Sequence, residues 1–223
     1  MKTQIHPFTD MRDGLPPMAG ALGRSGVSLD LLGASSPGRS ALEAEIRDCY
    51  AHHFGARVEE FMPWLLRVTR RGDGARGVIG LRPASRERLY LEDYLFRPVE
   101  EAIAAVAGHP VPRTAVVEIG QLAVESRQVV VPLFRELVPF LLQQGFGWVC
   151  FTATGPVRSL LARAGLAGCE LAPAREACVA GHQDAWGDYY RHDPRVIVGD
   201  LQQPSGFRCI PVDAACRTEE AGA

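Results

Sequence analysis

The 223-residue sequence has few of the features that mark secreted, membrane-spanning or nucleic-acid-binding proteins. No continuous apolar segment resembling a secretory signal lies near its start, and no apolar run approaches the roughly 18 residues of a transmembrane helix. Lys2 is the only lysine, and the formal net charge of −2 predicts no bulk attraction to nucleic acid or anionic lipid. We therefore expect a cytoplasmic protein with no transmembrane segment and no nucleic-acid partner.

Familiar metal-binding and catalytic motifs are absent as well. The six cysteines form no CxxC pair and no cysteine–histidine spacing matches a zinc site, so we expect no metal and no disulfide framework. The sequence contains no GxSxG, HExxH, Walker or dinucleotide-binding motif. These absences argue against a serine hydrolase, a zinc protease, an NTPase and a dehydrogenase.

The chain does contain enough apolar material for one core. Hydrophobic residues make up 47% of the sequence and charged residues 22%, which is typical of a globular protein of one domain. Residues 1–25 are rich in proline, glycine and polar side chains, and residues 204–223 have no regular pattern. We therefore expect one domain at residues 26–203 between two flexible ends.

Apolar periodicity predicts alternating strands and helices. The strands are expected at residues 27–32, 64–70, 77–82, 114–124, 146–154 and 195–198, and the helices at 39–54, 99–107, 131–144 and 156–164. Residues 89–95 fit either a strand or a helix. This order predicts an α/β or α+β domain, with a mixed central sheet and helices on both faces.

The expected strand at residues 114–124 carries a carboxylate, Glu118, inside an apolar run. Burying a lone carboxylate is costly unless it is paired, hydrogen-bonded or protonated. Glu118 therefore either takes a proton during a reaction, or pairs with an arginine such as Arg113 or Arg82 and orders the sheet.

Five segments resemble the thermostable hemolysin family, a bacterial group, in unbroken order. They are residues 50–61 (YAHHFGARVEEF), 89–100 (LYLEDYLFRPVE), 113–124 (RTAVVEIGQLAV), 148–158 (WVCFTATGPVR) and 186–201 (WGDYYRHDPRVIVGDL). This family looks like a branch of the GNAT-like acyltransferases, so the resemblance implies a GNAT-like fold. The family's name implies, as an alternative, a membrane-active hemolysin.

Residues 118–124 (EIGQLAV) are also similar to a strand of the acyl-homoserine-lactone synthases, which pass an acyl chain from acyl carrier protein to an amine. The resemblance implies an N-acyltransferase that moves a long-chain acyl group from acyl-CoA or acyl-phosphopantetheine to a small amine or amino acid. It implies that Glu118 takes the proton of the acceptor ammonium and that Gln121, Leu122 and Val124 lie near the substrate. Gly120 and Gln121 stand where the synthases have residues of Asn or Ser-Arg type.

The segment after this strand departs from the usual GNAT pattern. Typical members have a glycine-rich loop there, whose N–H groups hold the pyrophosphate of coenzyme A. Residues 125–131 (ESRQVVV) contain no glycine. This favours an acyl carrier protein as donor, or a coenzyme A held mainly by its pantetheine arm. It also leaves open a GNAT-like domain that binds a partner without catalysis.

Two further groups of candidates come from the same segments. Glu92, beside Tyr90, either shares the acceptor ammonium with Glu118 or is a structurally paired acid. Thr152 and Thr154 end a strand where GNAT folds open two strands to admit pantetheine, although threonine is also simply common in strands.

The last candidates are aromatic. Trp186 and Tyr190 lie in a cluster that either lines an acyl or acceptor pocket or packs as part of the core.

Overall fold

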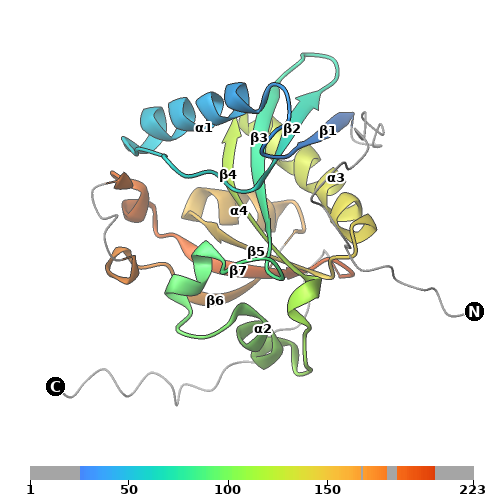
Figure 1. The fold of residues 1–223 in the computed structure, drawn as a ribbon, viewed down its shortest axis with the longest axis vertical. Coiled ribbons are helices and arrows are strands. Elements are labelled where there is room, and N and C mark those ends of the chain that lie inside the picture. Colours follow the sequence, from blue (N-terminus) through green and yellow to red (C-terminus); the bar gives the residue numbers. More distant parts are fainter. Residues whose placement is uncertain (1–25, 167, 180–184, 204–223) are drawn as a thin grey trace, which may run out of the picture.

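The computed structural model describes residues 26–166, 168–179 and 185–203 (Figure 1). The expected flexible ends, residues 1–25 and 204–223, lie outside this part of the chain. A seven-stranded mixed sheet forms the centre of the domain, in the order β1-β2-β3-β4-β5-β7-β6. The strands are β1 (Val27–Leu32), β2 (Trp64–Arg70), β3 (Arg76–Pro83), β4 (Val116–Val124), β5 (Trp148–Ala153), β6 (Cys169–Pro173) and β7 (Arg195–Asp200).

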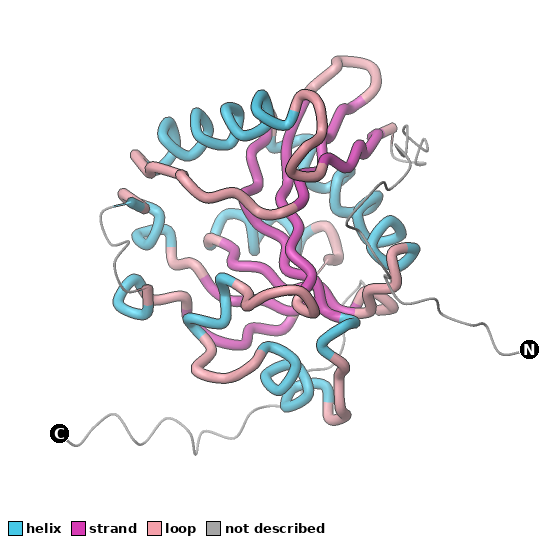
Figure 2. Tube along the Cα trace, in the orientation of Figure 1, coloured by secondary structure: helices cyan, strands magenta, loops and turns pink. Residues whose placement is uncertain are grey.

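Four α-helices cover the sheet: α1 (Arg39–Phe54), α2 (Val99–Ala107), α3 (Val130–Gln143) and α4 (Gly155–Arg163). Figures 1 and 2 show α1 and α2 at opposite ends of the molecule. The ambiguous segment at residues 89–95 contains a short 3₁₀ helix, η1 (Tyr90–Tyr94). The expected mixed sheet with helices on both faces is confirmed, whereas β6 was not anticipated.

Side chains alternate between the two faces of the sheet. One face packs against α3 and α4 in a large core that includes Leu66, Ile79 and Val117. The opposite face carries two separate cores, one under α1 that includes Val78 and one under α2 that includes Cys150. The face shared by α1 and α2 therefore has a boundary between its two cores.

Polar side chains and glycines occupy that boundary. In the antiparallel register of β3 and β4, Gly80 lies opposite Gly120 and Arg82 lies opposite Glu118. All four share the face of Val78 by alternation, so the sheet brings the predicted carboxylate and an arginine together between the α1 and α2 cores.

Strands β4 and β5 form the one parallel pair of the described sheet, and they separate part-way along their length. Their ladder runs from Val116–Trp148 to Ile119–Phe151 and stops there, although both strands continue. An extra residue in β4 distorts its pairing with β3 at the same point, and Gln121 adopts a φ of 52°. A bulge of this kind bends a strand, which explains why β4 leaves β5 here.

One cysteine departs from the sequence-based expectation. Cys169 is disulfide-bonded. Cys49, Cys150 and Cys178 are free thiols. The chain thus contains a disulfide, although not a dense framework.

Candidate active site

A cavity of about 90 Å³ lies where β4 and β5 separate. One wall is apolar and comes from the face covered by α3 and α4, with Ile119 of β4, Phe134 of α3 and Phe151 of β5. The other wall is aromatic, with Tyr50 of α1 and Tyr189. The cavity therefore reaches both faces of the sheet through the gap between the two strands.

Four of the predicted site residues line this cavity: Gln121, Leu122, Thr152 and Thr154. Thr154 is the N-cap residue of α4, but its side chain makes no capping hydrogen bond. The backbone of β4 beyond Ile119 has no partner strand on the β5 side. Its N–H and C=O groups can therefore hydrogen-bond a ligand placed in the gap.

Glu118 lies on β4 beside this region, and its side chain is 3% exposed. Its carboxylate accepts hydrogen bonds of 3.0 Å from the backbone N–H groups of Tyr90 and Leu91, in η1. Burial raises the pKa of Glu118 to about 7, against the opposing effects of the Arg82 charge and the two N–H donors. A carboxylate with this pKa is half ionised at neutral pH, which suits a group that takes up and releases protons.

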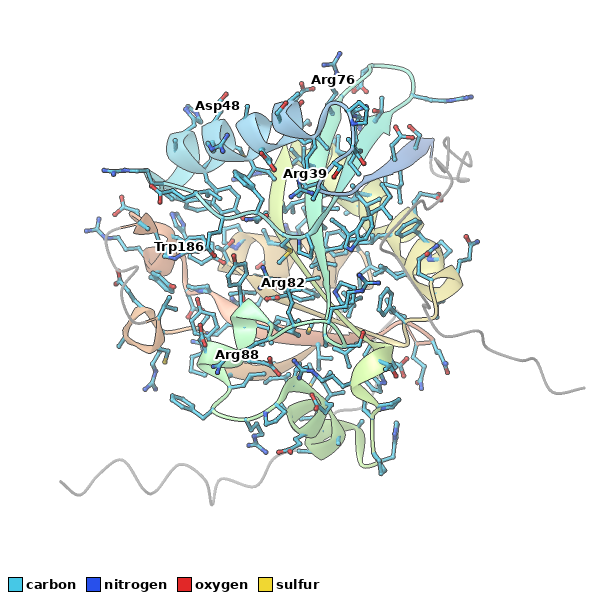
Figure 3. The ribbon with its side chains drawn as sticks, in the orientation of Figure 1. Arg39, Asp48, Arg76, Arg82, Arg88 and Trp186 are labelled. Atoms are coloured by element: carbon cyan, nitrogen blue, oxygen red, sulfur yellow. The ribbon has the colours of Figure 1, made fainter. Side chains whose placement is uncertain are left out.

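Arg82 is the cation closest in register to Glu118. Its guanidinium lies 3.9 Å from the ring centroid of Tyr90, and Figure 3 shows Arg82 near the middle of the molecule. The guanidinium also lies 3.5 Å from Glu87 and donates to the carbonyl of Arg88 at 3.3 Å. Of the two arginines considered from the sequence, Arg82 is therefore the one whose charge acts on Glu118.

Glu118 does not itself line the cavity. Met62 covers Gly80 and Gly120 on the Glu118 face, and a Cβ atom added at Gly120 would lie only 2.7 Å from its terminal methyl group. The two glycines thus make room for an apolar side chain between the carboxylate and the cavity. A proton passing from the cavity to Glu118 needs a water molecule or a small shift of Met62.

Glu92 sits in a separate ion-pair network. Both of its carboxylate oxygens bond the Arg113 guanidinium, at 2.6 and 3.0 Å, and it also accepts the N–H groups of Leu89 and Val99. Burial opposes ionisation, but Arg113 and the two N–H donors hold the pKa of Glu92 at about 2. Arg113 also bonds Glu100 at 2.7 Å. The geometry therefore favours a structurally paired acid, and not a residue that binds the acceptor ammonium together with Glu118.

A larger, open hollow of about 740 Å³ adjoins this network, between η1 and the start of α2. Its walls include Glu92 and Glu100, and both already form ion pairs with Arg113. The smaller cavity between β4 and β5 is therefore the better candidate for chemistry, because it adjoins the carboxylate with the raised pKa.

The sequence profile of the thermostable hemolysins matches residues 32–205. The chain belongs to the thermostable hemolysin family. No curated protein sequence matches it. Among solved structures, FeeM, an N-acyl amino acid synthase from uncultured soil microbes, aligns over 79% of this chain and 93% of its own at 13% identity, with a TM-score of 0.52. The AHL synthase LasI aligns over 78% of this chain and 90% of its own at 14% identity, with a TM-score of 0.50. These similarities establish a GNAT-like fold.

The remaining predicted residues lie outside the cavity wall. Tyr90 donates its hydroxyl to Glu60, and Tyr190 shares a 2.9 Å hydrogen bond with the hydroxyl of Tyr94. Val124 lies against Gly77 in the β3–β4 pair.

Trp186 does not line the cavity but packs behind two residues that do. Its ring packs against Tyr50 and Tyr189, with centroid distances of 6.4 and 5.5 Å, and Figure 3 shows it below α1. Sequence reasoning missed Tyr50, Phe54 and Phe134 as cavity residues, since their helical spacing is typical of an ordinary core.

Within the described residues, no group of three or more His, Cys, Asp or Glu side chains could hold a metal ion. Carboxylate, hydroxyl and backbone groups are thus the polar groups that this site offers.

Both polar atoms of the Gln121 side chain form hydrogen bonds to the backbone. The amide oxygen accepts the N–H of Met62 at 2.9 Å, and the amide nitrogen donates to the carbonyl of Glu60 at 2.7 Å. These bonds attach the segment before β2 to the bulge in β4. Contact between this residue and a substrate would therefore use its backbone.

Replacing Gln121 with alanine is expected to lower the free energy of unfolding by about 1–3 kcal/mol, because the buried N–H of Met62 loses its acceptor. Hydrogen exchange should show faster exchange at Met62, and urea denaturation should show the loss of stability. Gln128→Ala is the control, since that side chain is exposed and makes one contact of 3.4 Å. Equal stability of the two variants would contradict the anchoring role.

Proposed function

We propose that this protein is an N-acyltransferase that moves an acyl group from a pantetheine thioester to a small amine or amino acid. One observation carries the proposal: a cavity opens between separated strands β4 and β5, beside a buried carboxylate whose pKa is raised to about 7. The gap can admit the thioester, and the carboxylate can accept the proton that an amine must lose before it attacks.

The donor is held mainly by its pantetheine arm. The segment after β4 is occupied with its own contacts, since Glu125 accepts the N–H of Arg76 and Ser126 caps the short turn before α3. It contains no glycine-rich cradle for a pyrophosphate. Coenzyme A and acyl carrier protein share the pantetheine arm, so both remain donors in this proposal.

The reaction joins the acceptor nitrogen to the acyl carbon and releases the pantetheine thiol. The acceptor ammonium gives a proton to Glu118 through water, and the neutral amine then attacks the thioester carbonyl. The C–N bond forms and the C–S bond breaks, and the second proton of the amine nitrogen passes to the departing thiolate, relayed by the Tyr189 hydroxyl in the cavity wall. Burial raises the pKa of Tyr189, so its hydroxyl stays protonated and passes a proton on as it receives one, without becoming a tyrosinate.

Purified protein incubated with acyl-CoA or acylated carrier protein and pooled amines and amino acids tests the proposal. We expect release of free thiol and an acyl amide detected by mass spectrometry. Binding of thioester without thiol release would instead indicate the non-catalytic binding domain. Absence of both binding and thiol release with every pair would rule the proposal out.

The family name suggests direct lysis as the alternative. No helix in the described residues is long and apolar enough to cross a membrane. We therefore expect the protein alone to release no dye from liposomes, whereas protein supplied with thioester and amine releases dye if its product is a surfactant. Leakage caused by the protein alone would favour the membrane-active hemolysin.

A further inference from the structure

Two phenylalanines close the apolar side of the cavity. Phe134 of α3 and Phe151 of β5 meet edge to face, with ring centroids 6.1 Å apart and an angle of 62° between the planes. Both line the cavity, and both are more than nine-tenths buried. They stand at the border between the cavity and the large core under α3.

The apolar wall is the natural place for the alkyl part of an acyl group. Ile119, Phe134 and Phe151 have no hydrogen-bonding side chain, whereas the opposite wall comes from Tyr50 and Tyr189, which each carry a hydroxyl group. Transfer of a methylene group from water to an apolar wall is favourable, and a polar acceptor is better served by the hydroxyls. The two walls therefore separate the acyl chain from the acceptor.

The volume of the cavity limits the length of that chain. A dry cavity of about 150 Å³ holds benzene, which has six carbons. The 90 Å³ of the whole cavity corresponds, in proportion, to about four carbons, and this is an upper limit for the acyl chain because the acceptor enters the same cavity. Beyond the phenylalanines there is no space to continue, because Leu133 and Leu137 belong to the same packed core and are at most 1% exposed.

We propose that Phe134 and Phe151 restrict the donor to short acyl groups, of about four carbons or fewer. This inference rests on the proposed function and replaces the long chain that the family resemblance suggested. A longer chain has to displace the aromatic pair into a core that is already filled.

The test measures binding of S-acyl-N-acetylcysteamine thioesters, which carry the end of the pantetheine arm common to both donors. Calorimetry compares acetyl, butyryl, hexanoyl, octanoyl and dodecanoyl probes on the wild-type protein. We expect acetyl and butyryl to bind, and hexanoyl to bind at least about 10-fold more weakly than butyryl. A factor of this size is typical when a ligand carries one methylene group more than a hydrophobic pocket can hold.

Phe134→Ala is expected to reverse this order, so that octanoyl binds about 10-fold more tightly than butyryl. Phe134→Leu keeps more of the packing and should move the preference in the same direction by a smaller factor. Phe140→Ala is the matched control, because it removes the same side chain from the same helix at a position outside the cavity wall. Its length preference should equal that of the wild type.

Each outcome is decisive. Wild-type protein that binds octanoyl or dodecanoyl as tightly as butyryl overturns the length limit and leaves the acyltransferase proposal standing. An unchanged order in folded Phe134→Leu and Phe134→Ala variants also overturns it. If no thioester of any length binds, the donor site itself fails, and the proposed function fails with it.

Discussion

Replacing Glu118 with glutamine is expected to lower kcat/KM for acyl transfer by about 10²–10⁴-fold, the usual contribution of a positioned general base. Glutamine is close to glutamate in shape but cannot accept the acceptor proton at neutral pH. The measurement is the rate of thiol release with one donor and one acceptor held constant. Among the residues that the structure describes, no acidic side chain lines the cavity, so none is placed there to replace Glu118.

The pH dependence of the same reaction gives an independent readout. Glu118 is active as a base only when ionised, and burial raises its pKa to about 7. We therefore expect the wild-type rate to fall as the pH drops through 7 and to level off above it. The residual activity of the glutamine variant should lack this inflection. A variant that keeps both the wild-type rate and the inflection at pH 7 would assign Glu118 a purely structural role.

Structural damage has to be separated from lost chemistry. The two N–H groups of η1 both point to this carboxylate, and a glutamine offers one acceptor oxygen in place of two. The folded-state pKa lies above the ordinary 4.5, so ionised Glu118 lowers the stability of the fold as pH rises from 4.5 through 7. Above pH 7 the glutamine variant escapes that cost. Thermal unfolding at pH 8 should therefore show a folded variant at assay temperature.

Much of the fold follows from local sequence pattern. The glycine-rich turn between the apolar segments 64–70 and 77–82 favours the β2–β3 hairpin that the structure shows. Strand β6 was missed because it has five residues, ends in Pro173 and pairs with β7 through an irregular register. Such a short edge strand depends on its neighbour more than on its own composition.

The site was predictable only in part. Glu118 could be identified from the sequence, because a carboxylate inside an apolar run is costly to bury and therefore stands out. The cavity residues Tyr50 and Phe134 carried no such signal, because periodicity distinguishes a buried face from an exposed one but does not show where two strands part. That separation depends on the bulge at Gln121, whose φ of 52° is a tertiary feature.

The role of Glu92 could not be predicted from the sequence either. Residues 89–95 fit both a strand and a helix, so the direction of each acid was undetermined. The partner of Glu92 is Arg113, which lies 21 positions further along the chain and meets it only in the folded domain. Contacts of this range are outside what a local pattern can specify.

Replacing Arg113 with alanine is expected to cost about 3 kcal/mol of unfolding free energy, toward the low end for a buried ion pair because Arg113 is partly exposed. Its loss leaves Glu92, 7% exposed, ionised beside only two backbone N–H donors, and also releases Glu100. Urea denaturation at pH 7 measures the change. Arg88→Ala is the matched control, since its ion pair with Asp93 is exposed and should contribute at most about 1 kcal/mol.

The pH dependence of stability identifies the cause of that loss. Arg113 and two N–H donors overcome the effect of burial and hold the pKa of Glu92 at about 2, below the ordinary 4.5. The resulting stabilisation is fully present above pH 4.5 and disappears as the pH falls toward 2. Arg113→Ala should therefore lose most of the acid-dependent decline that wild-type protein shows over this interval. A variant that is less stable by the same amount at pH 7 and pH 3 would instead attribute the loss to packing of the arginine side chain, and not to the charge of Glu92.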